Sequence, residues 1–270
     1  MSEHRAVERT TDPLTQTALV KALQHLGLKA GDTVLVHASL SSLGWVIGQE
    51  MAVINALLDV LGAHGTLMMP AHTAGNSEPS NWENPPIPKT WWPLVREHAP
   101  AFDPLTSPTR GMGRIAELFR TYPNVHRSSH PEVSFAAHGP NAQALILDHA
   151  HSPMFGESSP LGALTRLQGK VLLLGVGYDV CTLLHLSEVL AQVRPMKRYG
   201  HAIQVRGKRA WATVRDYDYD DAPFEEIGKA FEVDNSVNIS TVGLATCRLI
   251  DAKPLVDFGT RWLQKHLNRP

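Results

Sequence analysis

The sequence predicts an α/β fold: a single domain whose largely parallel central sheet is flanked by helices. Continuous apolar runs at 33–37, 66–70 and 171–176 are typical of strands buried on both faces. Segments with helical spacing alternate with these runs, as βαβ units require. The length of 270 residues, with 43% hydrophobic residues, suits one large domain over 1–270.

The first part of the chain contains a strand–helix–strand unit behind an opening helix. Asp12 is a predicted N-cap, Pro13 takes the first helical position, and Gly27 ends this helix. The βαβ unit that follows has a strand at 33–37, a helix at 51–61 and a strand at 66–70.

A proline-rich insertion at 71–109 follows this unit. Its prolines rule out long regular elements, and Trp82, Trp91 and Trp92 favour an ordered segment because disordered chains are poor in aromatic residues. Long irregular segments in compact domains are usually functional, so we expect this excursion to border the active site.

The remaining elements follow in the same way. Alternation at 201–205 and 210–216, joined by a turn at 206–209, predicts an antiparallel C-terminal hairpin. We further predict helices at 111–119, 141–149, 161–167, 179–193, 225–232 and 254–266, and strands at 134–137, 171–176 and 241–250.

Composition excludes several classes of function. Lys plus Arg is 25 and Asp plus Glu is 26, so the chain lacks the basic surface that nucleic acid requires. No apolar run is long enough to span a membrane, and the polar start is unlike a secretory signal. Cys181 and Cys247 fit neither a disulfide framework nor a zinc spacing. We therefore expect a cytoplasmic protein without a metal.

The strongest chemical motif lies just beyond the strand at 171–176. In a helix, Cys181, His185 and Glu188 share one face, and a carboxylate three residues after a histidine can orient it and stabilise its protonated form. His185 is thus a candidate general base, and the alternative is an ordinary polar helix face. Cys181 is either a nucleophile activated by His185 or an inert buried thiol. Thr182 is a candidate donor to an oxyanion.

Two further segments resemble anion-binding loops. Val36 to Gly44 ends a parallel strand with small hydroxyl residues, and Thr106 to Gly113 precedes a helix with Arg110 nearby. Ordinary capping is the alternative for both segments. His37 is either a site histidine or a histidine bonded within the core.

Acidic residues could attract a polycationic substrate. Glu78 and Asp103 lie in the excursion, and Asp216 begins an acidic stretch after the hairpin. A solvated loop is the alternative for the stretch at 216–221.

Four motifs in order make the sequence resemble the aminoglycoside 3-N-acetyltransferases, also called the antibiotic N-acetyltransferase family, over nearly the whole chain. They lie at 35–44, at 65–70, at 127–131 and from 172 to 188. The chain has Leu184 where that family usually has threonine, and Cys181 where it usually has a small polar residue. The acceptor range is therefore open.

The resemblance implies transfer of acetyl from acetyl-CoA to the 3-amino group of deoxystreptamine, which inactivates the antibiotic. It implies His185 as base, Glu188 as its orienting carboxylate, and His37 in the acceptor pocket. Acetyl-CoA is then expected to contact His37, Ser39, Leu40, Ser41, Ser42, Leu43, Gly44, Ser107, Thr109, Gly111, Met112, Gly113, Arg127 and Ser128. The aminoglycoside is expected to contact His37, Glu78, Asp103, Asp179 and Asp216.

The expected partners are an aminoglycoside and acetyl-CoA, with a homodimer as a further option. Two alternatives stay open at this point. One is a CoA-dependent N-acetyltransferase of the same fold that acts on a different amine. The other is a non-catalytic aminoglycoside-binding or nucleotide-binding protein.

Overall fold

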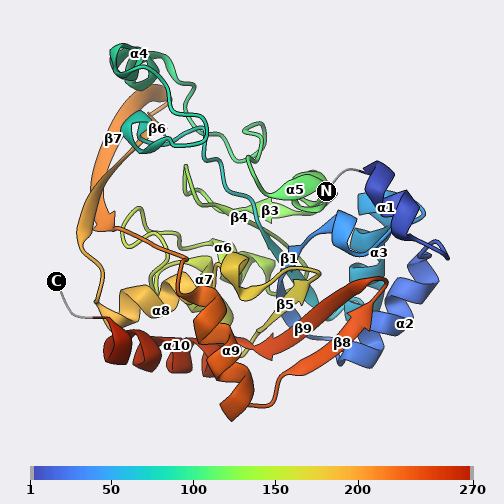
Figure 1. Ribbon diagram of the computed structural model, residues 1–270. Coiled ribbons are helices and arrows are strands. Elements are labelled where there is room, and N and C mark those ends of the chain that lie inside the picture. The colour runs from blue at the N-terminus through green and yellow to red at the C-terminus, as the bar shows by residue number, and fades with distance from the viewer. Residues whose placement is uncertain (1–2, 268–270) are drawn as a thin grey trace.

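A seven-stranded sheet forms the centre of the molecule (Figure 1). The structure, a computed structural model, describes residues 3–267, so the termini of the predicted 1–270 domain lie outside the described residues. The strand order is β3-β4-β2-β1-β5-β9-β8. The strands are β1 (Thr33–Ala38), β2 (Thr66–Pro70), β3 (His126–Arg127), β4 (Phe135–His138), β5 (Lys170–Leu174), β8 (Asn238–Val242) and β9 (Ala245–Asp251).

The sheet confirms the predicted α/β class but is mixed rather than largely parallel. Only β1 pairs in parallel, with β2 on one side and β5 on the other. The outer strands pair antiparallel because β4 and β9 run against their inner neighbours. The parallel centre therefore coincides with the three continuous apolar runs of the sequence.

Helices cover both faces of this sheet (Figure 1). Val34 and Val36 of β1 pack into the core beneath α2, α3 and α5, whereas Leu35 packs into the core beneath α6, α7, α8 and α10. The alternation explains why these strands are apolar at every position. The α-helices are α1 (Glu3–Arg9), α2 (Gln16–Leu26), α3 (Gln49–Leu61), α4 (Trp92–His98), α5 (Gly113–Phe119), α6 (Ala142–Ile146), α7 (Pro160–Arg166), α8 (Leu184–Ala191), α9 (Phe224–Asp234) and α10 (Ala252–His266).

The hairpin and the excursion together form what we call the hairpin lobe: β6 (Met196–Val205), β7 (Lys208–Tyr217) and residues 71–109. The two strands pair only with each other and project away from the central sheet (Figure 1). Asn76 ties the excursion to β6, since its side chain accepts from the Ala202 amide at 2.8 Å and donates to the Ala202 carbonyl at 2.9 Å. The predicted hairpin is thus confirmed, and it is longer than the alternation indicated.

Four predicted elements differ from the structure. The opening helix, α2, begins at Gln16 with Thr15 as its N-cap, and not at Pro13 with Asp12 as its N-cap. The expected strand at 241–250 is two strands, β8 and β9, joined by a tight turn at Gly243, whose φ is 59°. The helix expected from 111 begins at Gly113, because Gly111 and Gly113 have φ near 80° and leave the α region.

The helix expected at 179–193 is a 3-10 turn, η4 (Tyr178–Val180), followed by α8. Cys181 has ψ of 85°, which is outside the helical region, so the chain changes direction there. Cys181 consequently does not share a helix face with His185, and its side chain packs in the core with no exposed surface.

Candidate active site

His185 and Glu188 form a hydrogen-bonded pair in α8, just beyond the carboxyl end of β5. The distance from His185 Nδ1 to Glu188 Oε2 is 2.6 Å. Since a carboxylate can only accept, Nδ1 carries the proton and Nε2 is the basic nitrogen. The Glu188 side chain has no exposed surface, and the His185 side chain is 16% exposed. The pairing that the i, i+3 spacing predicted is therefore present.

Aromatic rings fix the plane of the His185 imidazole. Phe155 stacks on it with ring centroids 4.7 Å apart, while Tyr219 and Phe224 contact it edge-on at 5.3 and 4.8 Å. Asp216 accepts a hydrogen bond from the Tyr219 hydroxyl at 3.0 Å. These contacts leave the ring one orientation, with its Nδ1 edge on Glu188.

Two other histidines belong to the same surroundings. Burial, together with the charge of His185, lowers the pKa of His37 to about 4. Burial and the neighbouring His37 and His185 lower the pKa of His72 to about 3. Nε2 of each ring is buried without a hydrogen-bond partner. At neutral pH both rings are uncharged, so His185 is the better candidate for taking up a proton.

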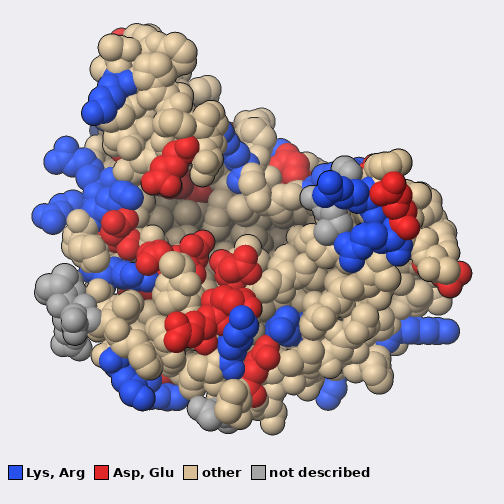
Figure 2. Space-filling model, in the orientation of Figure 1, with Lys and Arg blue, Asp and Glu red and all other residues tan. Residues whose placement is uncertain are grey.

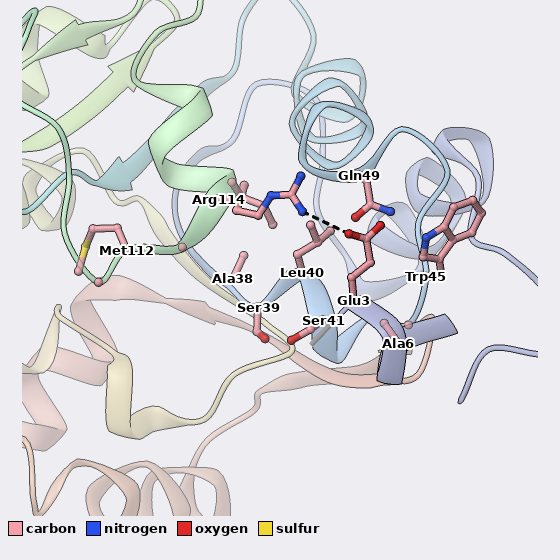
Figure 3. Close-up of a pocket in the computed structure, with 14 residues that line it drawn as sticks. Glu3, Ala6, Ala38, Ser39, Leu40, Ser41, Trp45, Gln49, Met112 and Arg114 are labelled. Carbon is pink, nitrogen blue, oxygen red and sulfur yellow. Dashed lines mark ion pairs between the residues drawn. The ribbon is translucent and has the colours of Figure 1, made fainter. Parts of the chain in front are cut away.

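A cavity of about 390 Å³ lies where the β1 loop meets the start of α5 (Figure 3). Seven of the residues predicted to contact acetyl-CoA line it: Ser39, Leu40, Ser41, Gly44, Gly111, Met112 and Gly113. Sequence reasoning missed Trp45 and Gln49 in the wall of this cavity. It also missed Glu3 and the whole of α1, because the polar amino-terminal segment carries no apolar periodicity. Figure 3 shows Glu3 pointing toward Arg114, which also pairs with Glu50 at 2.9 Å.

A smaller cavity of about 160 Å³ continues from the first toward the His185–Glu188 pair, which we call the dyad. Both are lined by Ala38, Gly111, Met112 and Ile115, and the smaller one also by His37 and Thr182. Thr182 lies one turn before His185, whose amide donates to the Thr182 carbonyl at 3.1 Å. The two cavities therefore connect the β1 loop with the residues beside the candidate base.

Several residues predicted to contact acetyl-CoA are engaged in contacts within the protein. Leu43 is 1% exposed and packs in the core. Ser42 points to a neighbouring cavity, with its hydroxyl bonded to that of Ser39 at 2.8 Å. Ser128 is 1% exposed, bonded to His149 and to the Phe135 amide. Their polar atoms are satisfied within the protein, which local spacing could not reveal.

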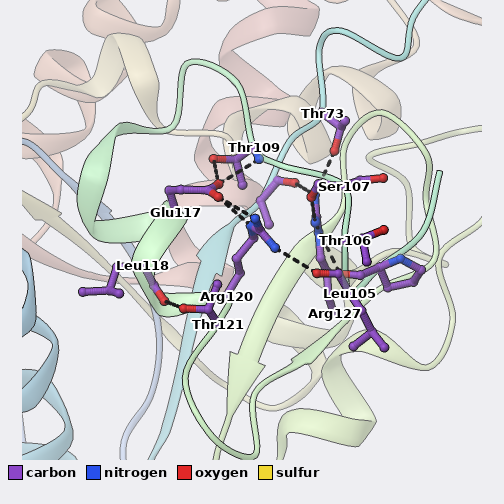
Figure 4. A network of polar contacts seen from close by, with 12 residues as sticks. Thr73, Leu105, Thr106, Ser107, Thr109, Glu117, Leu118, Arg120, Thr121 and Arg127 are labelled. Atoms are coloured by element: carbon purple, nitrogen blue, oxygen red, sulfur yellow. Dashed lines mark hydrogen bonds and ion pairs between the residues drawn. The ribbon is translucent and has the colours of Figure 1, made fainter. Parts of the chain in front are cut away.

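Arg127 is the most fully engaged of these residues (Figure 4). Its guanidinium donates to the carbonyls of Ala71 at 2.6 Å and Ser107 at 2.5 Å, and to the Thr73 hydroxyl at 2.8 Å. Thr109 is likewise engaged, because its amide and hydroxyl both donate to Glu117. Arg127 thus fastens both ends of the excursion to β3 and has no N–H group directed at a cavity.

The carboxylates that were predicted to contact the acceptor fall into two groups: three are bonded within the protein and one is exposed. Glu78 is 5% exposed and paired with Arg96, Asp103 accepts the amides of Leu105 and Thr106, and Asp216 is fully buried. The three carboxylates are thus engaged in contacts within the protein, so this geometry does not favour their predicted contact with a substrate. Asp179 is exposed, at the carboxyl end of β5. Figure 2 shows further Asp and Glu side chains around a hollow below the lobe.

The sequence profile of the family described as aminoglycoside 3-N-acetyltransferase matches residues 35–264. The chain belongs to this family. The residues that make up its dyad and both cavities lie within the matched range, apart from Glu3 and Ala6. The predicted family membership, and with it the prediction of an acetyltransferase, is confirmed.

Relatives support the assignment over the full length. The chain is 43% identical to the SPbeta prophage-derived aminoglycoside N(3')-acetyltransferase-like protein YokD of Bacillus subtilis over 96% of this chain and 95% of that protein. The crystal structure of YokD superimposes with a TM-score of 0.95, covering 97% of this chain and 98% of that one. Aminoglycoside N(3)-acetyltransferase VII of Streptomyces paromomycinus is 38% identical over 100% of this chain and 98% of its own.

A further solved relative, AAC-IIIb as a binary complex with CoASH, has a TM-score of 0.85 at 32% identity, covering 96% of this chain and 99% of that one.

Within residues 3–267, no helix is long and apolar enough to cross a membrane. The same residues contain no group of three or more His, Cys, Asp or Glu arranged to hold a metal ion.

Proposed function

We propose that this enzyme transfers acetyl from acetyl-CoA directly to the 3-amino group of the deoxystreptamine ring of an aminoglycoside, with His185 as general base. The observation that carries the proposal is the Nδ1 bond of His185 to the buried Glu188, which leaves Nε2 free to accept a proton. The family's activity and the CoASH complex of a relative support the choice of donor.

The two connected cavities provide the path for acetyl-CoA. The larger one, at the β1 loop and the α5 start, suits the phosphate-bearing part, since Arg114 and the small residues Ser39, Gly111 and Gly113 line it. The narrower one suits the pantetheine arm, because its lining is mainly apolar and it ends at His37 and Thr182. The thioester would then lie beside the dyad.

The proton balance follows from this arrangement. The acceptor ammonium first loses one proton to solvent, Nε2 of His185 takes a proton from the resulting amine as it attacks, and Glu188 stabilises the imidazolium. The amine nitrogen bonds to the thioester carbon, the C–S bond breaks, and His185 returns the proton to the leaving sulfur. The Thr182 hydroxyl is the proposed donor to the developing oxyanion, a type of interaction worth about 10²–10³-fold in rate.

The acceptor is expected to enter from the hollow below the hairpin lobe. Acidic side chains surround this hollow in Figure 2, and the exposed Asp179 lies at the same end of the sheet as His185. Carboxylates there would attract an acceptor with several ammonium groups. A relative that binds another amine would need no such surplus of acidic groups.

Thiol release from acetyl-CoA with a panel of aminoglycosides tests the proposal. We expect turnover with at least one deoxystreptamine compound, sequential rather than ping-pong kinetics, and acetylation at the 3-amino group by NMR. His185→Gln should lower kcat by about 10²–10⁴-fold and still bind CoA, whereas His98→Gln, an exposed position in α4, should leave kcat unchanged. Turnover only with unrelated amines would overturn the proposed acceptor, and a fully active His185→Gln enzyme would overturn the proposed base.

A further inference from the structure

The side of Glu188 that faces away from His185 is occupied by Arg194. Arg194 Nε lies 2.5 Å from Glu188 Oε1, the oxygen that does not bind the imidazole. The backbone amide of Asp220 donates to the same oxygen at 3.2 Å. The Glu188 side chain has no exposed surface and that of Arg194 is 12% exposed, so water screens this pair little.

Arg194 is also fixed from its outer side. Its Nη2 donates to the Asp220 carbonyl at 2.8 Å, and its Nη1 pairs with the Asp220 carboxylate at 3.0 Å. Arg194 precedes β6 and Asp220 follows β7. The root of the hairpin lobe is therefore clamped onto the carboxylate that orients His185.

We infer that Arg194 is a positioning residue that sets the base strength and orientation of His185 through Glu188. The inference rests on the proposed function of His185 as a base. Glu188 has one negative charge and two cationic partners, the imidazolium that forms in catalysis and a permanent guanidinium. Because the guanidinium holds one oxygen, only part of the carboxylate charge favours protonated His185.

Removing the guanidinium of Arg194 should change the stability of protonated His185 in a predictable direction. In Arg194→Met, the whole charge of Glu188 faces His185, so the imidazolium is more stable relative to the neutral ring. Glu188 also loses its fixed orientation. The rate plateau should therefore fall about tenfold, because the ring is less well aligned for proton transfer. Arg194→Lys keeps the charge but cannot bond Glu188 and the Asp220 carbonyl with one planar group.

The other charged and titratable groups around His185 are common to all variants. His37 lies on β1 and His72 on the segment after β2, and the charge of His185 contributes to the lowered pKa of each. Tyr219 contacts the ring from the segment after β7. Since none of them bonds to Arg194, a change in the titration of His185 would report the Arg194–Glu188 contact.

NMR titration of the His185 ring, assigned by the resonance lost in His185→Gln, tests this without any substrate. We expect the midpoint to move to higher pH in Arg194→Met and to stay unchanged in Arg194→Lys. Lys170→Met is the control, because Lys170 pairs with Asp32 at 2.9 Å in a bridge with little exposed surface at the opposite end of β5. An equal midpoint in Arg194→Met and the wild type, or an equal shift in Lys170→Met, would overturn the inference.

The pH profile of kcat/KM for an aminoglycoside gives the second readout. Its acid limb should move with the NMR midpoint in Arg194→Met, while Arg194→Lys keeps the limb and loses only plateau rate. A purely structural role would lower the population of folded enzyme and leave the limb in place, which would overturn the inference. If the NMR shift occurs while no aminoglycoside is acetylated by the wild type, the proposed function fails and the role of Arg194 stands.

Discussion

At the scale of single residues, burial decides which of the candidate groups can react. Cys181 has no exposed surface, and burial raises the pKa of its thiol to about 12. It is therefore a thiol and not a thiolate at neutral pH, and only the thiolate is a strong nucleophile. Of the two interpretations of Cys181 that the sequence left open, the structure favours the inert one.

We accordingly predict that Cys181→Ala keeps kcat within about threefold of the wild type. The lost sulfur should cost roughly 1 kcal/mol of unfolding free energy, as for other small truncations in a core. Initial rates and denaturant unfolding measure the two effects. Loss of all turnover in the variant, together with an acetylated wild-type enzyme by mass spectrometry, would instead show acyl transfer through Cys181.

At the scale of elements, contacts distant in sequence give residues their roles. The i, i+3 spacing was enough to predict the His185–Glu188 pair, because both residues lie on one helix. Arg194 and Asp220 meet Glu188 only because the hairpin between them folds back on itself, and no local pattern records that. The same limit explains Arg127, which the motif at 127–131 suggested as a CoA contact and the fold uses to hold the excursion.

The elements themselves were predictable to a similar extent. The central strands β1, β2 and β5 follow from their continuous apolar runs, since only strands buried on both faces need them. β8 and β9 merged into one predicted strand because a single glycine, Gly243, marks their turn. α1 escaped prediction because just one of its residues, Ala6, is buried.

The role of Arg127 in the excursion gives a prediction at this scale. Arg127→Met removes the Arg127 donor from the carbonyls of Ser107 and Ala71, of which Ala71 keeps the Ser134 hydroxyl, and each lost bond to a charged group costs about 1.5–3 kcal/mol. We expect the unfolding free energy to fall by about 2–4 kcal/mol, measured by urea denaturation. Arg110→Met is the control, because Arg110 is exposed on the same loop and should change stability by less than about 0.5 kcal/mol. Equal effects of the two substitutions would contradict the role of Arg127.

At the scale of the whole molecule, four histidines join the hairpin lobe to the central domain. The His130 ring lies 4.8 Å from that of His149 and 5.5 Å from those of His151 and His201. They come from the β3–β4 loop, the loop after α6, and β6. Burial lowers the pKa of His130, His149 and His151. His130, His149 and His151 thus stay uncharged at neutral pH, and acidification would place like charges among them.

The pH dependence of stability follows with a definite sign. Burial lowers the pKa of His149 from 6.5 to about 4, with a weaker opposing effect from its bond to the Met154 carbonyl. Between these values the unfolded chain binds the proton and the folded chain does not, so stability falls as the pH falls from 6.5 toward 4. Each such histidine contributes up to about 1.4 kcal/mol per pH unit, and His37 and His72 act in the same direction.

We therefore predict that the wild type loses several kcal/mol of unfolding free energy between pH 6.5 and pH 5, measured by urea denaturation at constant ionic strength. His149→Gln removes one titrating group, so its stability should depend on pH less steeply, by up to about 1.4 kcal/mol per unit, even though the variant is less stable at pH 7. His98→Gln, at an exposed position, should keep the wild-type slope. If His149→Gln and the wild type lose stability at the same rate on acidification, then folding does not lower the pKa of His149, which contradicts the prediction.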